Sequence, residues 1–274
     1  MLNGMTPDAS EPKAKADTVR AYGGPPAYER AKTTGKTKLT YEQWVTVRTP
    51  GFKRWFGDWE GLRAQRRLDA MESARVHVPQ AWRGLSEEAM RAKMVEALDA
   101  MVKKKTVIPH AELGDVLVGR RGAKKTESTS KDPVDMLIAA DLEAALPKSI
   151  LASARPSNEQ GVNGYSKLLL PVCVDGMEFV AILTVRGQKD GHWYYNTVTV
   201  LDAGQEKRPG SYGSPGALSR PLGETPITGL ATFYRYRLIR VNPATVSKAI
   251  DPTTGEPLAD AVMAYTARLS KTAL

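Results

Sequence analysis

The sequence predicts an α+β protein in which short N-terminal helices precede an antiparallel β-sheet with helices packed against it. Apolar residues recur at three- and four-residue spacing over 86–105, as in a helix with one buried side. Three strand-like runs follow between 167 and 200, and their connections contain Asp-Gly pairs at 175–176 and 190–191, a strong hairpin signal. A chain of 274 residues is long enough for one large or two small domains.

The N-terminal part of the chain predicts an arm and then a helical domain. Residues 1–37 are rich in Lys, Pro, Gly and Ala and lack apolar periodicity, which is typical of a flexible basic arm. Residues 38–105 are expected to form a tryptophan-rich helical domain. Its last helix has Ser86 as a good N-cap, and lysines at 103–105 suit the negative C-terminal end.

A segment dense in aromatic and cationic side chains, residues 41–60, opens the helical domain. Thr40 and Gln43 form a possible capping box for a short helix. Thr49 can cap the next helix, with Pro50 at its first position. Three of the five tryptophans fall here and should hold the turns together: Trp44, Trp55 and Trp59.

After residue 113 the pattern changes to short strands and helices. Residues 114–122 read as a strand that ends in a basic, glycine-containing turn. A helix is expected over 132–146, followed by a short second helix through 150–151. The three strand-like runs are expected to form an antiparallel meander. The middle run, 177–186, is apolar at both alternating sets of positions, so other parts of the protein should cover both faces of the sheet at its centre.

The remaining sequence predicts a loop, a strand and a helix. Residues 203–226 are rich in Gly, Pro and Ser and read as a long loop. A strand is expected over 233–241, with Arg235 and Arg237 on one face, and a closing helix over 257–270.

Composition limits the classes of function. The formal net charge of +9 favours a polyanionic partner, nucleic acid first and an anionic membrane second, although a solvated basic surface would give the same charge. A single cysteine and three scattered histidines provide no disulfide and no metal motif, so neither metal nor other cofactor is expected. No apolar run reaches about 18 residues and no signal core begins the chain, which favours the cytoplasm over a membrane location.

Two regions resemble known families. The stretch TYEQWVTVRTPGFKRWFGDWE, residues 40–60, resembles a recurring unit in the large polyvalent proteins of phages and conjugative elements. Residues 113–202 resemble the nuclease-like domain often found with it, from the barnase–EndoU–colicin–RelE superfamily of metal-independent ribonucleases. The matching pieces are GRRGAKKT (119–126), DPVDMLIAADLEAALPKSI (132–150), PVCVDGMEFVAILTVR (171–186) and WYYNTVTV (193–200).

The resemblance implies a barnase/EndoU-like fold and a ribonuclease-like domain over residues 106–274. Metal-independent cleavage of RNA requires a base for the ribose 2′-hydroxyl, cations for the phosphate and an acid for the leaving oxygen. The candidate catalytic residues are Arg186, His192, Tyr195 and Lys125. The candidate nucleic-acid contacts are Arg120, Arg121, Lys124, Lys167, Arg235 and Arg237.

Two functions follow as hypotheses. The first is an effector or toxin of a phage or mobile element that cleaves RNA, with tRNA as one candidate target and an acidic immunity protein as one candidate partner. The second is a catalytically inactive, basic protein that binds nucleic acid or a host factor and is delivered with mobile DNA against host defence. Relatives often carry Tyr-Tyr-Asp-His where this chain has Tyr-Tyr-Asn-Thr, so Thr197 replaces a candidate acid or base and favours the second hypothesis.

Overall fold

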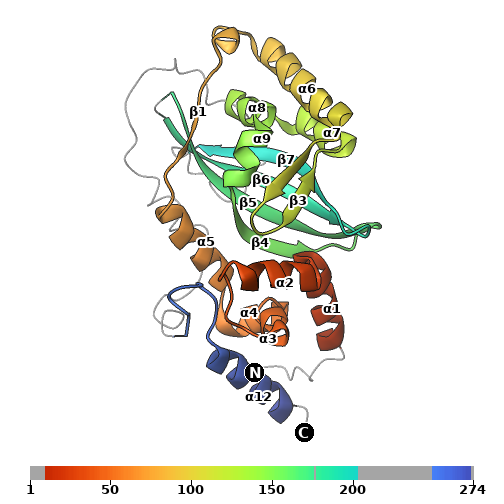
Figure 1. The fold of residues 1–274 in the computed structure, drawn as a ribbon, viewed down its shortest axis with the longest axis vertical. Helices are drawn as coiled ribbons and strands as arrows, with labels where there is room; N and C mark the ends of the chain where they lie inside the picture. The colour runs from red at the N-terminus through yellow and green to blue at the C-terminus, as the bar shows by residue number, and fades with distance from the viewer. Residues whose placement is uncertain (1–9, 176, 203–248, 273–274) are drawn as a thin grey trace, which may run out of the picture.

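The computed structural model describes residues 10–175, 177–202 and 249–272, and within them a curled seven-stranded β-sheet lies between two groups of helices (Figure 1). The strand order is β1-β5-β6-β7-β3-β2, and β4 pairs with β5 beside this path. The strands are β1 (Ala74–Val76), β2 (Val107–His110), β3 (Gly114–Leu117), β4 (Ile150–Pro156), β5 (Val162–Val174), β6 (Met177–Gln188) and β7 (Trp193–Asp202).

The predicted antiparallel meander is confirmed and forms the centre of the sheet. β5 pairs antiparallel with β6, and β6 with β7, so that Leu169, Ile182 and Thr199 lie opposite one another. Val180 and Leu183 of β6 are both buried although they face opposite sides, because helices cover the two faces of the sheet. The pairs β1–β5 and β3–β7 are parallel, which makes the complete sheet mixed.

One group of helices covers the larger hydrophobic core. It consists of α6 (Glu87–Lys104), α7 (Arg120–Thr129), α8 (Pro133–Ala140), α9 (Leu142–Ala145) and the 3-10 helix η2 (Leu146–Lys148). Ser86 caps α6 as predicted, since its side chain accepts a hydrogen bond from the amide of Ala89. Met94 and Leu98 of α6 are fully buried in this core, together with Leu168 and Leu183 of the sheet.

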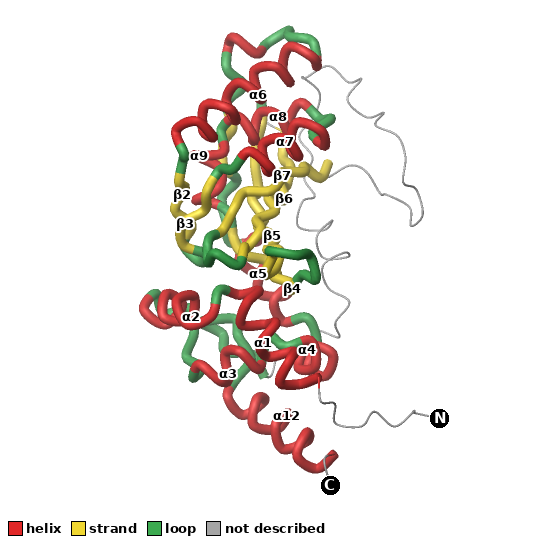
Figure 2. Tube along the Cα trace, turned by 90° about the vertical axis from the view of Figure 1, so that its right-hand side faces the viewer, coloured by secondary structure: helices red, strands yellow, loops and turns green. Residues whose placement is uncertain are grey.

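The other group of helices surrounds the tryptophan-rich segment (Figure 2). It consists of α1 (Ser10–Tyr22), α2 (Gly24–Thr33), α3 (Tyr41–Thr46), α4 (Pro50–Phe56), α5 (Trp59–Asp69) and α12 (Ala259–Thr272). Thr40 and Gln43 form the predicted capping box of α3, and Thr49 caps α4. Trp59 is fully buried, and its indole Nε1 donates a hydrogen bond to the Val47 carbonyl at 2.8 Å. Trp59 therefore joins α5 to the segment between α3 and α4, as expected, whereas Trp55 is exposed.

The N-terminal region is more ordered than its composition predicts. Residues 10–33, expected to belong to a flexible arm, form α1 and α2, while residues 1–9 lie outside the described part of the chain. Ala21 is fully buried against β5, where a side chain at Gly164 would contact it. The Tyr22 hydroxyl donates to Glu60 Oε2 at 2.6 Å. These tertiary contacts stabilise helices that local propensity does not reveal.

Three further expectations differ from the structure. The basic segment after Gly119 is the first turn of α7, not a turn between elements. Residues 150–151 begin β4 instead of a short helix, because they pair antiparallel with β5. α6 was assigned to the tryptophan-rich domain of residues 38–105, but it packs on α7 and α8 over the sheet. The predicted closing helix is confirmed as α12, and the predicted loop 203–226 and strand 233–241 lie outside the described residues.

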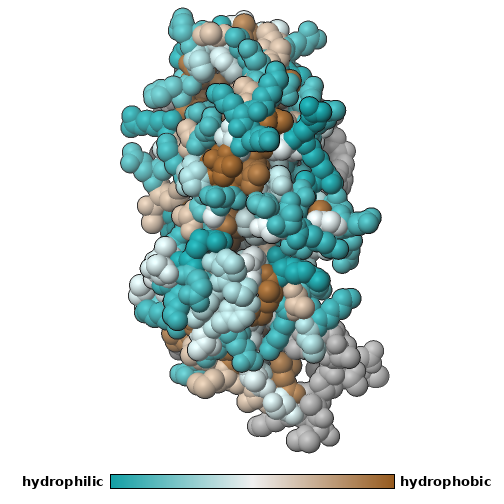
Figure 3. All heavy atoms as spheres, turned by 45° about the vertical axis from the view of Figure 1, so that its right-hand side comes forward, coloured by the Kyte–Doolittle hydropathy of each residue, from teal (hydrophilic) through white to brown (hydrophobic). Residues whose placement is uncertain are grey.

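Hydrophilic side chains dominate the face of the molecule seen in Figure 3, where hydrophobic side chains form small, separate groups. No helix within the described ranges is both long and apolar enough to cross a lipid bilayer.

Candidate functional site

A row of polar side chains crosses the sheet near the β6–β7 hairpin. Tyr165 of β5 lies directly opposite Arg186 of β6, which lies opposite Tyr194 of β7. Directly opposed residues project from the same face of a sheet, and their sequence neighbours project from the other. Val185 and Tyr195 accordingly point into the larger core.

Arg186 is a buried cation that forms no ion pair with any residue the structure describes. The residue is 5% exposed, and its Nε and Nη1 atoms have no hydrogen-bond partner among the described residues. Burial lowers the pKa of its guanidinium, and the positive charge of Arg121 lowers it further. A buried, unpaired charge is unfavourable until an anion binds it.

A glutamate in the loop after β4 forms hydrogen bonds with residues beside Arg186. Glu159 is exposed and accepts hydrogen bonds from the Arg121 guanidinium and from the Tyr165 hydroxyl, the latter at 2.5 Å. The hydrogen bond from Tyr165 and the one from Arg121 lower the pKa of Glu159, so this carboxyl group is ionised at neutral pH.

The β6–β7 hairpin contributes a histidine whose position is fixed by contacts with an aspartate. The amide of His192 donates to Asp190 Oδ1 at 2.9 Å, and its ring Nδ1 lies 3.5 Å from the same oxygen. Tyr194 donates through its hydroxyl to Asp190 Oδ2 at 3.1 Å. Partial burial acts to raise the pKa of Asp190, but the hydrogen bonds from His192 and Tyr194 outweigh it and lower that pKa.

Further cations border the same surface. Lys167 lies two residues along β5 from Tyr165, in a row with Thr184 and Thr197, and is exposed. We call this surface the Arg186 face and define it by Arg121, Glu159, Tyr165, Lys167, Arg186, His192 and Tyr194.

Helix α7 forms one border of the Arg186 face. Arg121, Lys125 and Thr129 recur at four-residue spacing and therefore share one side of the helix. Thr129 Oγ1 lies 3.1 Å from Thr197 Oγ1, while Arg121 reaches Glu159. Lys125 thus lies between these two contacts, on the side of α7 nearest the face. Arg120 and Lys124 are also exposed on α7.

The structure brings together four predicted residues, Arg121, Lys167, Arg186 and His192, and places Lys125 beside them. Tyr195 requires a correction. It is 1% exposed in the larger core, its hydroxyl accepts a hydrogen bond from Thr126 Oγ1 at 2.9 Å, and burial raises its pKa. Strand alternation places Tyr194, not Tyr195, on the Arg186 face. Arg235 and Arg237 lie outside the described residues.

Sequence reasoning missed Glu159 and Tyr165, and it considered Tyr194 beside Tyr195 but selected Tyr195. The period of two in a strand relates Tyr165 to the predicted Lys167, and Tyr194 to the predicted His192, so this signal was available. Glu159 follows β4 in a polar loop that gives no such signal, and only its contacts with Arg121 and Tyr165 reveal it.

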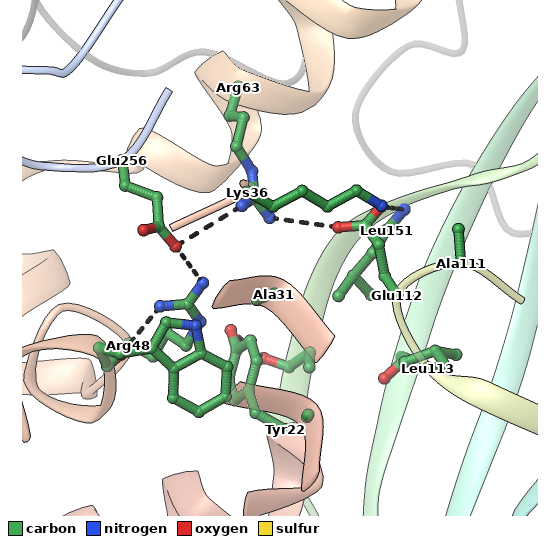
Figure 4. A pocket seen from close by; sticks show the side chains of 14 residues that line it. Tyr22, Ala31, Lys36, Arg48, Arg63, Ala111, Glu112, Leu113, Leu151 and Glu256 are labelled. Atoms are coloured by element: carbon green, nitrogen blue, oxygen red, sulfur yellow. Dashed lines mark hydrogen bonds and ion pairs between the residues drawn. The ribbon is translucent and has the colours of Figure 1, made fainter. Parts of the chain in front are cut away.

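A second charged cluster lies where the helices around the tryptophan-rich segment meet the sheet, and it surrounds a small cavity (Figure 4). Arg48 Nη2 lies 2.5 Å from Glu256 Oε1, and Arg63 Nη1 lies 3.8 Å from the same oxygen. Arg63 Nη2 is in turn 4.0 Å from Glu112. The cavity measures about 30 Å³, which is room for a water molecule and not for a substrate. We therefore assign this cluster a role in stability.

Within the described residues no three His, Cys, Asp or Glu side chains come together as metal ligands would.

Comparison with known proteins gives a match over part of the chain. Residues 86–195 match the family described as Large polyvalent protein-associated domain 3. The matched part runs from α6 to the first residues of β7 and contains every residue of the Arg186 face. This match supports an association with large polyvalent proteins. Neither the curated proteins nor the solved structures compared with the chain include a significant match.

Proposed function

We propose that the Arg186 face binds the phosphate backbone of RNA. The supporting observation is the guanidinium of Arg186, which is 5% exposed and has two nitrogen atoms without partners in the described part of the chain. Arginine presents donors in a planar fork that matches the oxygens of a phosphate group. Arg121, Lys125 and Lys167 border the same surface and would contact neighbouring phosphates.

Aromatic side chains suit this face to nucleic acid better than to a simple anion. Tyr165 and Tyr194 lie on either side of Arg186 across the sheet. Aromatic rings beside phosphate-binding cations provide stacking surfaces for bases in unpaired nucleic acid. The formal charge of +9 would attract RNA to the protein over a longer range.

Cleavage of RNA without a metal ion is a second candidate function, favoured by the presence of Glu159 and His192 on the same face. An ionised Glu159 could take the proton of a ribose 2′-hydroxyl as its oxygen forms a bond to phosphorus. The bond from phosphorus to the 5′-oxygen would break, and protonated His192 would give its proton to that leaving oxygen. Arg186 and Arg121 would stabilise the charge that develops on the phosphate oxygens.

In a phage or conjugative element, either activity would act in the cytoplasm of a bacterial host. A ribonuclease would serve as an effector or toxin, and an acidic immunity protein could cover the Arg186 face. An inactive RNA-binding protein would instead interfere with host defence. The position of Thr197, which contacts Thr129 and carries no titratable group, is compatible with the inactive form.

RNA binding is tested by comparing Arg186→Met with Arg83→Ala. Arg83 is an exposed arginine that pairs with Asp175, at the end of β5 remote from the β6–β7 hairpin. Each of the two variants loses one positive charge, so a difference between them reflects the position of the arginine. Arg186→Met should weaken binding and reduce the slope of log affinity against log salt concentration by about 1. Arg83→Ala should change neither quantity. Equal affinities of the two variants would contradict the proposal.

Cleavage is tested separately by incubating the protein with total bacterial RNA in EDTA. The parent protein should produce discrete fragments, and His192→Ala or Glu159→Gln should remove them. Intact RNA with a parent protein that binds RNA would exclude cleavage and leave the binding function in place.

A further inference from the structure

A groove lies on the opposite side of the β6–β7 hairpin from Arg186. It has a volume of about 400 Å³ and separates the hairpin from the junction of α1 and α2. Gly187 and Trp193 line it, and each is the sequence neighbour of a residue on the Arg186 face. Because neighbouring residues of a strand point to opposite faces, the groove and Arg186 share one hairpin but not one surface.

Two glycines beside this groove make room for the indole of Trp193. A side-chain carbon at Gly187 would lie 2.9 Å from the ring of Trp193. Gly23 has a φ of 82°, in the region that favours glycine, and its backbone also approaches Trp193. The indole is consequently held between two backbone segments that carry no side chains. Trp193 is 6% exposed, so its indole forms part of the groove wall.

The walls of the groove present a donor and an acceptor. Arg30 is held in place because its Nη2 donates to the Leu113 carbonyl at 2.7 Å, while its Nε has no partner among the described residues. Asp115 is exposed in the same groove and offers a carboxylate. Ligand sites of this size generally combine apolar walls with a few such groups, and nucleobase edges carry matching acceptors and donors.

His192 connects the groove to the Arg186 face. It lines the groove and, through Asp190, is held beside Tyr194. A ligand that reached both surfaces would have to pass around the hairpin tip. A single RNA strand can do so because its bases are free to turn away from one another, whereas a duplex keeps its bases paired inside.

We propose that the groove takes an unpaired base of the same RNA strand whose phosphate Arg186 binds, so that single-stranded RNA is the ligand. This inference rests on the proposed function. The carboxylate of Asp115 accepts hydrogen bonds from the N–H groups of the base, and Arg30 donates to a base acceptor.

Binding of one short RNA, single-stranded or annealed to its complement, tests the inference. The single strand should bind at least about tenfold more tightly than the duplex. Asp115→Asn should weaken binding of the single strand about fivefold or more, because the NH2 group that replaces one carboxylate oxygen can only donate and the negative charge is lost. The matched control is Asp260→Asn, an exposed aspartate on α12, which should have no effect. Thermal unfolding should show that both variants are folded.

The outcomes separate the two proposals. Equal binding of single-stranded and duplex RNA would overturn the groove assignment. Tighter binding by Asp115→Asn would also overturn it, since the aspartate would then only repel phosphates. If Arg186→Met weakens RNA binding but Asp115→Asn does not, the groove proposal fails and the proposed function remains. If the parent protein binds no RNA, the proposed function fails as well.

Discussion

Asp135 Oδ1 accepts a hydrogen bond from the backbone amide of Val200 at 2.5 Å. Val200 lies in the part of β7 beyond its short pairing with β3, which includes only Trp193 and Tyr194. The buried carboxyl group of α8 therefore satisfies a backbone amide in the part of β7 that β3 does not pair. Its burial, together with the charge of Asp132, raises the pKa of Asp135 to about 7, although the hydrogen bond from Val200 opposes the increase.

This pKa predicts that stability decreases as the pH rises. The folded-state pKa exceeds the ordinary value of 3.8, so Asp135 stabilises the fold when protonated and loses this contribution as the pH rises through about 7. Asp135→Asn keeps the acceptor and cannot ionise. From about pH 5 to pH 8, the unfolding free energy of the parent should fall by about 2–3 kcal/mol relative to the variant. Denaturant titrations at several pH values measure this difference, and parallel pH profiles would contradict it.

The Arg48–Glu256 ion pair predicts that the stability of the fold depends on the carboxylate of Glu256. Glu256 is 1% exposed and also accepts a hydrogen bond from Thr37. Glu256→Ala leaves Arg48 and Arg63 buried without this partner and should lower the unfolding free energy by about 3–5 kcal/mol. Glu256→Gln should cost less because it keeps an acceptor. Thermal unfolding should show no change for Glu143→Ala, an exposed control.

The close packing of Gly122 against β7 predicts that a larger residue there displaces α7 and weakens RNA binding at the Arg186 face. A side-chain carbon there would lie 2.0 Å from the carbonyl oxygen of Tyr195, so Gly122→Ala forces α7 away from β7. We expect a loss of about 1–3 kcal/mol in stability and weaker RNA binding, because Arg121 and Lys125 move with the helix. Glu127→Ala, an exposed change on the same helix, is the control for stability. Unchanged melting of Gly122→Ala would contradict this packing.

The adjacent tyrosines predict opposite effects. Tyr195→Phe leaves the buried Thr126 hydroxyl without its partner and should cost about 1 kcal/mol in stability with no change in RNA binding. Tyr194→Phe should leave stability nearly unchanged, because its hydroxyl is near the surface, and should weaken RNA binding by releasing Asp190. Melting and binding curves of both variants test this reversal. An effect of Tyr195→Phe on binding alone would place that residue in the site.

Several features were predictable because they depend on neighbouring residues. The capping box of Thr40 and Gln43, the cap at Thr49 and the cap at Ser86 use contacts three residues apart. The meander follows from alternating apolar runs and Asp-Gly connections. Arg186, His192 and Lys167 could be selected because strand position and charge are visible in the sequence.

Other features depend on contacts between residues far apart in the sequence. α1 and α2 form where Ala21 and Tyr22 bury against β5 and Glu60, contacts that composition does not reveal. The approach of Glu159 to Arg121 likewise depends on how the loop after β4 folds over the sheet.

The sequence by itself determined the α+β class, the helix caps, the central hairpins and the basic character of the chain, because local periodicity and composition carry them. Only the tertiary structure decided that two nitrogen atoms of Arg186 lack partners within the described ranges, that Tyr194 lies on its face while Tyr195 is buried, and that a groove lies behind the same hairpin. The physical reason is that burial and unsatisfied hydrogen-bonding groups arise from long-range packing, which no local pattern specifies.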